Sequence, residues 1–146
     1  MPNPSLNPPL LELTSRPDLG VLIGRWQHQL ALPTELRACY EQLADLGLST
    51  NCRFWLQDLR RRASLDQDTK RWLLEDYYRD VARRFGQRLF VAYLFSPSIH
   101  QQLMEAPDYA PPEAYEGEPF ALDFFGDEGA ALRWLQAYQP LGSRTA

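Results

Sequence analysis

An unbroken apolar run in the second half of the chain, residues 89–95, places the strongest constraint on the fold. A run of this length is typical of a β-strand, and its lack of alternation with polar residues predicts that both of its faces are buried. A strand buried on both faces needs helices on both sides of its sheet. We therefore expect an α/β protein in which residues 89–95 form a central strand.

Segments typical of strands and of helices alternate along the rest of the chain. Strands are predicted at 10–13, 19–26, 52–58, 89–95 and 120–125, and helices at 33–47, 64–85, 96–104 and 127–138. The short connection between the first two strands predicts a hairpin. The order β-β-α-β-α-β-α-β-α predicts a mixed, largely parallel sheet of about five strands flanked by helices.

Length and composition indicate one globular domain. The chain has 146 residues, which suits a single core. We expect a proline-rich flexible lead-in at 1–9, the α/β domain at 10–139 and a flexible tail at 140–146. The two cysteines, Cys39 and Cys52, stand in apolar runs, so we interpret them as buried side chains and not as a disulfide.

The charge and the apolar segments exclude some classes of partner. A net charge of -4 argues against general binding to nucleic acid, because attraction to phosphates needs concentrated positive charge. No apolar run approaches the roughly 20 residues that span a bilayer. Residues 1–9 also lack the basic and apolar parts of a signal peptide. We therefore expect a cytoplasmic protein.

The candidate site follows the predicted buried strand at 52–58. Asp58 ends this strand, and three arginines come soon after it: Arg60, Arg61 and Arg62. In open α/β sheets, binding sites usually form at the carboxyl ends of the strands. The arginines can bind a phosphate or a partner's carboxylates. Alternatively, they form a solvated loop in which one of them pairs with Asp58.

The helix after this loop holds two further candidates. Ser64 stands at its predicted start, where it is either an N-cap or a phosphate acceptor. Trp72 is our candidate for an aromatic anchor that binds a partner. Tyr77 and Tyr78 are adjacent and cannot both face inward on a regular helix. We therefore expect one of these two tyrosines to be exposed.

Catalysis and metal binding are not predicted. Ser98 and His100 are two positions apart on a helix and do not face each other. His28 is isolated, and two histidines without a carboxylate cluster do not predict a metal site. We expect no catalytic residue, no metal and no cofactor.

Several segments resemble the STAS-like domains related to the bacterial anti-anti-sigma factor family, chiefly its small stand-alone members. The order of the elements and the apolar strand at 89–95 fit this family. Three sequence segments carry the resemblance: Trp55-Leu56-Gln57-Asp58-Leu59-Arg60, Ser64-Leu65-Asp66-Gln67-Asp68 and Asp127-Glu128-Gly129-Ala130-Ala131-Leu132-Arg133-Trp134-Leu135. The resemblance covers roughly residues 10–139.

The resemblance implies a bacterial, non-enzymatic regulatory domain that docks onto a protein partner. In the phosphorylated members, a serine at the start of the helix after the central strand is the switch. Asp58 falls where those members keep an aspartate, and Ser64 is the nearest hydroxyl on the helix side. The family's Asp-Ser-Ser-Gly pattern is absent, and the arginines at 60–62 stand in that loop instead.

We therefore predict docking through the end of strand 52–58, loop 59–63 and the following helix. The partner is another protein or a second copy of this chain. The acidic loop at 105–119 steers a basic partner or packs against the arginine face of a second copy, or it is an insertion loop with no role. The alternative from a different class is a small apolar ligand-binding domain with a pocket beneath helix 66–85.

Overall fold

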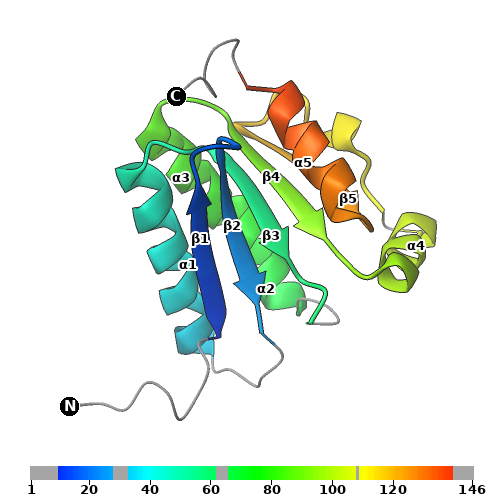
Figure 1. Cartoon of the computed structure of the whole chain (residues 1–146). Coiled ribbons are helices and arrows are strands. Elements are labelled where there is room, and N and C mark those ends of the chain that lie inside the picture. The colour runs from blue at the N-terminus through cyan, green and yellow to red at the C-terminus, as the bar shows by residue number, and fades with distance from the viewer. Residues whose placement is uncertain (1–9, 28–32, 62–65, 108, 140–146) are drawn as a thin grey trace.

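The computed structural model describes residues 10–27, 33–61, 66–107 and 109–139. Their strands form one sheet in which neighbours along the chain are also neighbours in space, in the order β1-β2-β3-β4-β5 (Figure 1). The strands are β1 (Leu11–Arg16), β2 (Val21–Trp26), β3 (Phe54–Asp58), β4 (Leu89–Leu94) and β5 (Phe120–Phe125). The α/β class and the five-stranded, mostly parallel mixed sheet are confirmed.

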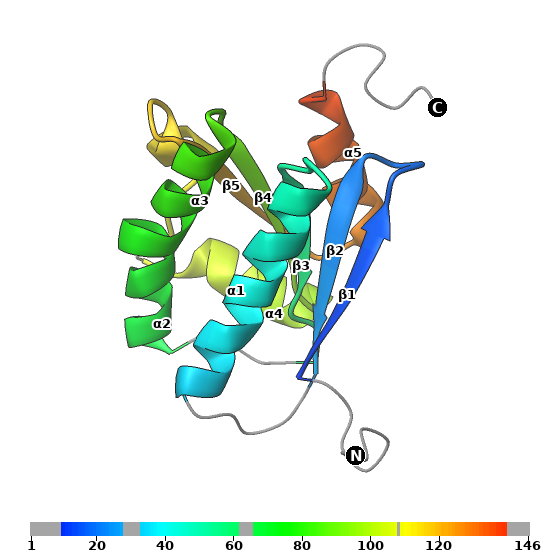
Figure 2. The same ribbon diagram turned by 90° about the vertical axis from the view of Figure 1, so that its left-hand side faces the viewer.

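The helices divide between the two faces of the sheet. Those before β4 lie on one face, and the last helix lies on the other (Figure 2). Their bounds are α1 (Pro33–Ser49), α2 (Gln67–Trp72), the π-helical segment η2 (Leu73–Tyr77), α3 (Tyr78–Phe85), α4 (Pro97–Glu105), the 3-10 segment η3 (Pro112–Tyr115) and α5 (Glu128–Ala137). No helix of the described residues is long and apolar enough to cross a membrane.

Strand direction creates two distinct edges of the sheet. β1 and β2 pair antiparallel, which confirms the hairpin, and β2 to β5 all run parallel. The parallel strands therefore begin at one edge, which we call the amino edge, and end at the other, the carboxyl edge. α5 starts near the carboxyl edge and ends near the amino edge (Figure 1).

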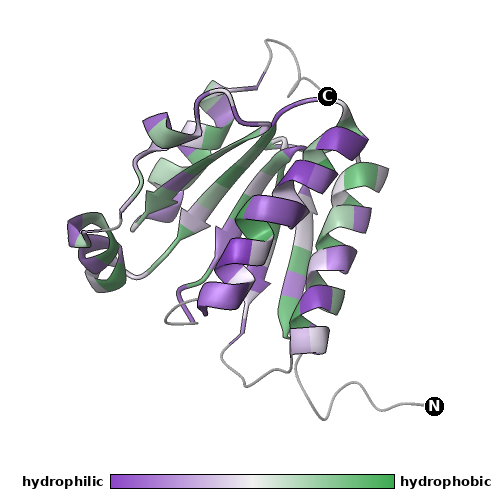
Figure 3. Ribbon diagram, turned by 180° about the vertical axis from the view of Figure 1, so that it is seen from behind, coloured by the Kyte–Doolittle hydropathy of each residue, from purple (hydrophilic) through white to green (hydrophobic). Residues whose placement is uncertain are grey.

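The side chains of β3 alternate between the two faces of the sheet. Phe54 and Leu56 pack with α5, while Trp55 packs on the face that α1 covers. Gln57 shares that second face, where it accepts a hydrogen bond from the Trp26 indole at 2.9 Å. Seen from behind, the strands are mostly hydrophobic, and the outward surfaces of the helices are largely hydrophilic (Figure 3).

The predicted end of α1 at Gly47 is wrong, since the helix continues to Ser49. Gly47 instead makes room for Trp55, because a Cβ at position 47 would lie 2.8 Å from Trp55 Cζ2. The turn after the helix contains Asn51, whose φ of 54° lies in the left-handed region that asparagine tolerates. The Cys52 N–H then donates to the Gly47 carbonyl at 2.8 Å, so β3 begins later than predicted.

The expectation that Tyr77 or Tyr78 is exposed is also wrong. Tyr77 is 7% exposed and Tyr78 is 0% exposed. The cause is the π-helical segment, whose wider turn lets both adjacent tyrosines face the core. The Tyr77 hydroxyl donates to the Tyr40 carbonyl, and the hydroxyls of Tyr78 and Tyr93 bond to each other.

Candidate functional site

Four charged side chains meet at the carboxyl edge, and we call them the carboxyl-edge cluster: Arg25, Asp58, Arg60 and Glu128. Arg25 and Asp58 are directly paired in the register of β2 and β3, so their side chains leave the same face. Arg60 follows β3, and Glu128 is the first residue of α5. Segments far apart in the sequence therefore build this cluster.

Each arginine of the cluster contacts both carboxylates. Arg25 Nη1 donates to Asp58 Oδ2 and to Glu128 Oε1, both at 2.8 Å. Arg60 Nη2 donates to the same two oxygens, at 2.9 Å and 3.3 Å. Arg60 also donates from its Nε and from its backbone N–H to Asp58 Oδ1, both at 3.0 Å. The two positive and two negative charges balance within the cluster.

Asp58 is the buried member of the cluster, with an exposed fraction of 6%. Burial alone raises the pKa of its carboxyl group, but the bonds from Arg60 and Arg25 outweigh burial, and the pKa lies below its usual value. The pKa of Arg60 is raised, chiefly by its bonds to Asp58. Bonding to Glu128 is the main cause that raises the pKa of Arg25. Asp58 and the two arginines are therefore charged at neutral pH.

An open pocket of about 630 Å³ surrounds the cluster. Arg61 lies on its wall, is exposed, and donates from Nη1 to the side-chain oxygen of Gln27 at 2.8 Å. The pocket is lined by Glu12, Arg25, Trp26, Gln27, Asp58, Arg60, Arg61 and Glu128. Its charged lining, with carboxylates and guanidiniums side by side, suits a polar or charged partner group better than an apolar one.

Two of the predicted residues meet as the sequence suggested. Asp58 ends β3 and pairs with Arg60, which confirms the interpretation that one arginine of the loop pairs with this carboxylate. Arg61 lies on the wall of the same pocket, where it donates to Gln27. Arg62 and Ser64 lie outside the described residues, so their predicted roles stay predictions.

The helix after the loop starts with Asp66 as its N-cap. The Asp66 side chain accepts a hydrogen bond from the Thr69 N–H at 3.0 Å, as expected for an N-cap carboxylate. The predicted start at Ser64 is therefore two residues too early. Asp66 therefore takes the N-cap position, and Ser64 lies outside the described residues.

Trp72 does not join the carboxyl-edge cluster. It is partly buried on the face covered by α1, where its ring lies 5.7 Å from that of Tyr40 and 5.1 Å from that of Tyr77. The Arg37 guanidinium lies 4.7 Å from the centre of the Trp72 ring. Trp72 therefore stands on the opposite face of the sheet from Glu128, although it follows the arginine loop in sequence.

Sequence reasoning missed Arg25 and Glu128. A usable signal was present, since Arg25 alternates with Val21 and Ile23 on one face of its strand. Its partner on β3 depends on the strand register, which the sequence does not state. Glu128 falls at the start of the helix predicted at 127–138, and its contacts with Arg25 and Arg60 were not foreseen.

The described ranges contain no group of three or more His, Cys, Asp or Glu side chains that could hold a metal ion. The Nε2 of His100 lies within hydrogen-bond distance of the Phe124 carbonyl oxygen, at 3.0 Å. Comparisons with protein-family models, curated proteins and solved structures found no match. The resemblance to STAS-like domains therefore stays a prediction, and function has to be argued from this chain's own residues.

Proposed function

We propose that this chain is a non-enzymatic regulatory domain that docks onto a protein partner. The docking surface is the end of β3, the loop at 59–63 and the start of the next helix. The observation that carries the proposal is that the Asp58 carboxylate forms ion pairs with two guanidiniums, those of Arg25 and Arg60. A carboxylate held ionised in this way is a poor general acid or base near neutral pH, whereas it fixes a loop firmly for binding.

The contacts around the loop define the chemistry of the partner. Arg25 and Arg60 are occupied by Asp58 and Glu128, and they hold the loop against the sheet. Arg61 is exposed beside them on the wall of the pocket, where it donates to the neutral side chain of Gln27. We therefore propose that the partner presents carboxylate side chains to Arg61, at the rim of the pocket.

Ser64 gives the proposed docking surface a means of regulation. It follows Arg61 closely in sequence and precedes the N-cap Asp66. A phosphate on Ser64 adds a charge of about -1.5 to -2 at neutral pH. This charge competes with the partner's carboxylates for the arginines, so we propose that phosphorylation weakens docking.

Photo-crosslinking in the organism of origin tests this proposal. A photoreactive amino acid at position 61 should capture one defined protein, and the same residue at position 133, on the exposed side of α5, serves as the control. The Arg60→Ala variant should lose most of the capture at position 61 while staying folded. Equal capture from positions 61 and 133 would contradict docking at the carboxyl edge.

The partner can also be a second copy of the chain, and light scattering of the purified protein separates the two cases. The alternative of an apolar ligand beneath helix 66–85 has less support from the structure. This helix presents Leu73, Tyr77, Tyr78 and Val81 to the sheet, and all four are buried there. The cytoplasmic location and the STAS-like relationship belong to the proposal as well.

A further inference from the structure

Two arginines stand together at the amino edge, and we call them the amino-edge arginines. Arg53 precedes β3 and Arg88 precedes β4, and the strands join where the Phe90 N–H donates to the Arg53 carbonyl at 2.9 Å. Both guanidiniums lie beside the Phe90 ring, at 5.6 Å and 5.7 Å from its centre. Two positive charges therefore share one small surface.

These charges are not balanced by a carboxylate of the described residues. Neither Arg53 nor Arg88 makes an ion pair there, although both side chains are partly buried. Burial lowers the pKa of the Arg53 guanidinium. The buried Nε of Arg88 has no hydrogen-bond partner among the described residues. An anion bound to the outer nitrogens of the two guanidiniums would supply the counter-charge that this edge lacks among the described residues.

Backbone carbonyls and rings hold the two arginines in place. Arg53 Nη1 donates to the Arg88 carbonyl at 2.9 Å, and its guanidinium lies 4.8 Å from the centre of the Phe54 ring. Arg88 Nη2 donates to the Tyr115 carbonyl, also at 2.9 Å. Each of these two bonds uses one nitrogen of its guanidinium. Because the bonds fix the orientation of the guanidinium, its remaining outer N–H groups can donate to an oxyanion such as phosphate.

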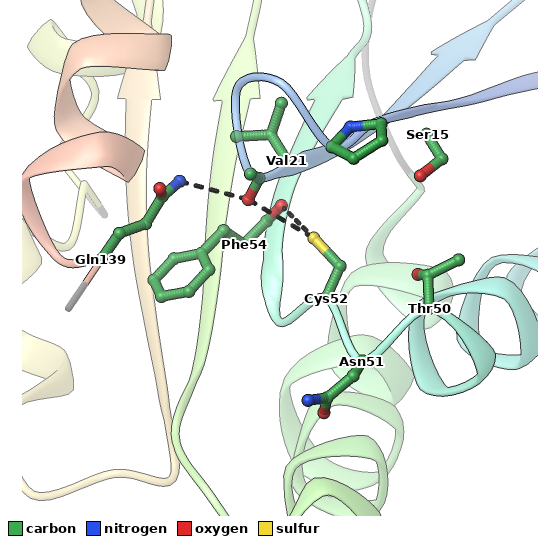
Figure 4. A pocket seen from close by; sticks show the side chains of 9 residues that line it. Ser15, Val21, Thr50, Asn51, Cys52, Phe54 and Gln139 are labelled. Atoms are coloured by element: carbon green, nitrogen blue, oxygen red, sulfur yellow. Dashed lines mark hydrogen bonds between the residues drawn. The ribbon is translucent and has the colours of Figure 1, made fainter. Parts of the chain in front are cut away.

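An uncharged pocket of about 330 Å³ is lined in part by Phe54, the residue whose ring Arg53 also contacts (Figure 4). Ser15, Thr50, Asn51 and Gln139 supply uncharged polar groups to its wall. The Gln139 Nε2 donates to the carbonyls of Leu19 and Gly20, at 3.0 Å and 3.1 Å, while its buried Oε1 has no partner among the described residues. Such a lining accepts and donates hydrogen bonds without favouring charge, which suits hydroxyl groups.

Combining these observations, we propose that the amino edge binds a small phosphorylated polyol, such as a sugar phosphate. The phosphate contacts Arg53 and Arg88, and the hydroxyl-bearing part enters the pocket that Phe54 helps to line. The exposed polar side chains of Ser15, Thr50 and Asn51 bond to the hydroxyls. This site lies at the opposite edge from the docking surface, so it does not depend on the proposed function.

NMR titration of the ¹⁵N-labelled protein tests the proposal with three probes at constant ionic strength: inorganic phosphate, ribose 5-phosphate and ribose. We expect phosphate to shift the amide signals of residues 52–54 and 88–90. Ribose 5-phosphate should shift these signals and those of residues 50, 51 and 139, and bind about tenfold more tightly than phosphate. Ribose alone should cause no saturable shift.

Two outcomes with the unmodified protein would overturn the inference. The absence of saturable shifts with both phosphate and ribose 5-phosphate would remove the site altogether. Equal affinities for these two probes would remove the polyol half of the proposal, since the pocket would then contribute nothing. These readings need no variant, so a folding defect cannot obscure them.

Two variants at the amino edge and one control variant elsewhere locate the binding site. Arg53→Gln and Arg88→Gln should each weaken ribose 5-phosphate binding about tenfold or more, because each removes a charge-assisted bond. Arg71→Gln removes an exposed arginine on α2 and should leave the affinity unchanged. Equal weakening by all three variants would show that net charge, and not this site, holds the probe, and would overturn the proposal.

Discussion

The two edges of the sheet use arginine in opposite ways. At the carboxyl edge, Arg25 and Arg60 meet two carboxylates of the chain itself. At the amino edge, Arg53 and Arg88 lie against aromatic rings and meet backbone carbonyls, with no ion pair among the described residues. The first arrangement satisfies its own charges, whereas the second leaves positive charge available to an external anion.

This difference shows that the presence of arginines alone does not identify a binding site. The arginine loop is the most conspicuous feature of the sequence, yet Arg60 mainly fastens the loop to Asp58. The amino-edge arginines are separated by more than 30 positions of sequence and form no motif. A guanidinium stabilises the fold when its counter-charge is internal, and it is available for ligand binding when the counter-charge is missing.

The largest effect should come from Asp58→Asn, which removes the shared acceptor of the carboxyl-edge cluster. Two guanidiniums then face each other with one carboxylate fewer, so the free energy of unfolding should fall by about 2–3 kcal/mol. Urea denaturation measures this change. Glu116→Gln, at an exposed carboxylate, is the control and should change stability by less than about 0.5 kcal/mol. A similar loss in both variants would break the contrast between the edges.

The pH dependence of stability should report the same carboxylate. The pKa of Asp58 is lowered in the folded protein, so its contribution is complete above its unfolded pKa of about 3.9. This contribution is lost as the pH falls from there through the folded pKa. The stability gap between the unmodified protein and Asp58→Asn should therefore narrow below pH ~4. Urea midpoints at several pH values measure it, and a constant gap would contradict the assignment.

Arg25→Met should have a smaller effect than Asp58→Asn. The substitution keeps much of the apolar stem and removes the bonds to Asp58 and Glu128, but Arg60 still contacts both carboxylates. We expect a loss of about 1–2 kcal/mol in the free energy of unfolding. Thermal or urea denaturation provides the value. An unchanged stability would mean that Arg60 alone neutralises the cluster.

Arg53→Met is the matched substitution at the amino edge and should have the smallest effect. No ion pair of the described residues is lost, only the bond from Arg53 to the Arg88 carbonyl, and methionine still covers the rings of Phe54 and Phe90. The free energy of unfolding should change by less than about 0.5 kcal/mol in either direction, since a cation–π contact at a partly exposed site contributes about this much. A loss as large as that of Arg25→Met would show that the two edges are equivalent.

Local sequence patterns were sufficient to predict the fold class, the hairpin and the position of Asp58. These features depend on apolar periodicity, short connections and strand ends, all of which are visible within short windows. The pairing of Asp58 with Arg60 was foreseeable for the same reason, since the two are close in sequence. The carboxyl-edge cluster as a whole was not, because Arg25 and Glu128 reach it only through the register of β2 and the direction of α5.

Two errors came from non-standard helix geometry and from tertiary packing. The π-helical turn at Leu73–Tyr77 lets both Tyr77 and Tyr78 face the core, whereas the prediction assumed the 3.6-residue period of a regular α-helix. Gly47 was predicted to end α1, although its missing side chain serves the close approach of Trp55. At Gly47 a neighbouring strand, and not the local sequence, decided the outcome.

The sequential order of the strands also has a consequence for how the chain folds. Each strand pairs with the one made just before it, so no pairing has to wait for a distant part of the chain. The entropy lost in closing each loop stays modest, and topologies rich in such near-sequence pairings fold faster than those that pair remote strands. During synthesis, β2 can pair with β1 at once, and β3, β4 and β5 can then add in turn to a surface that already exists.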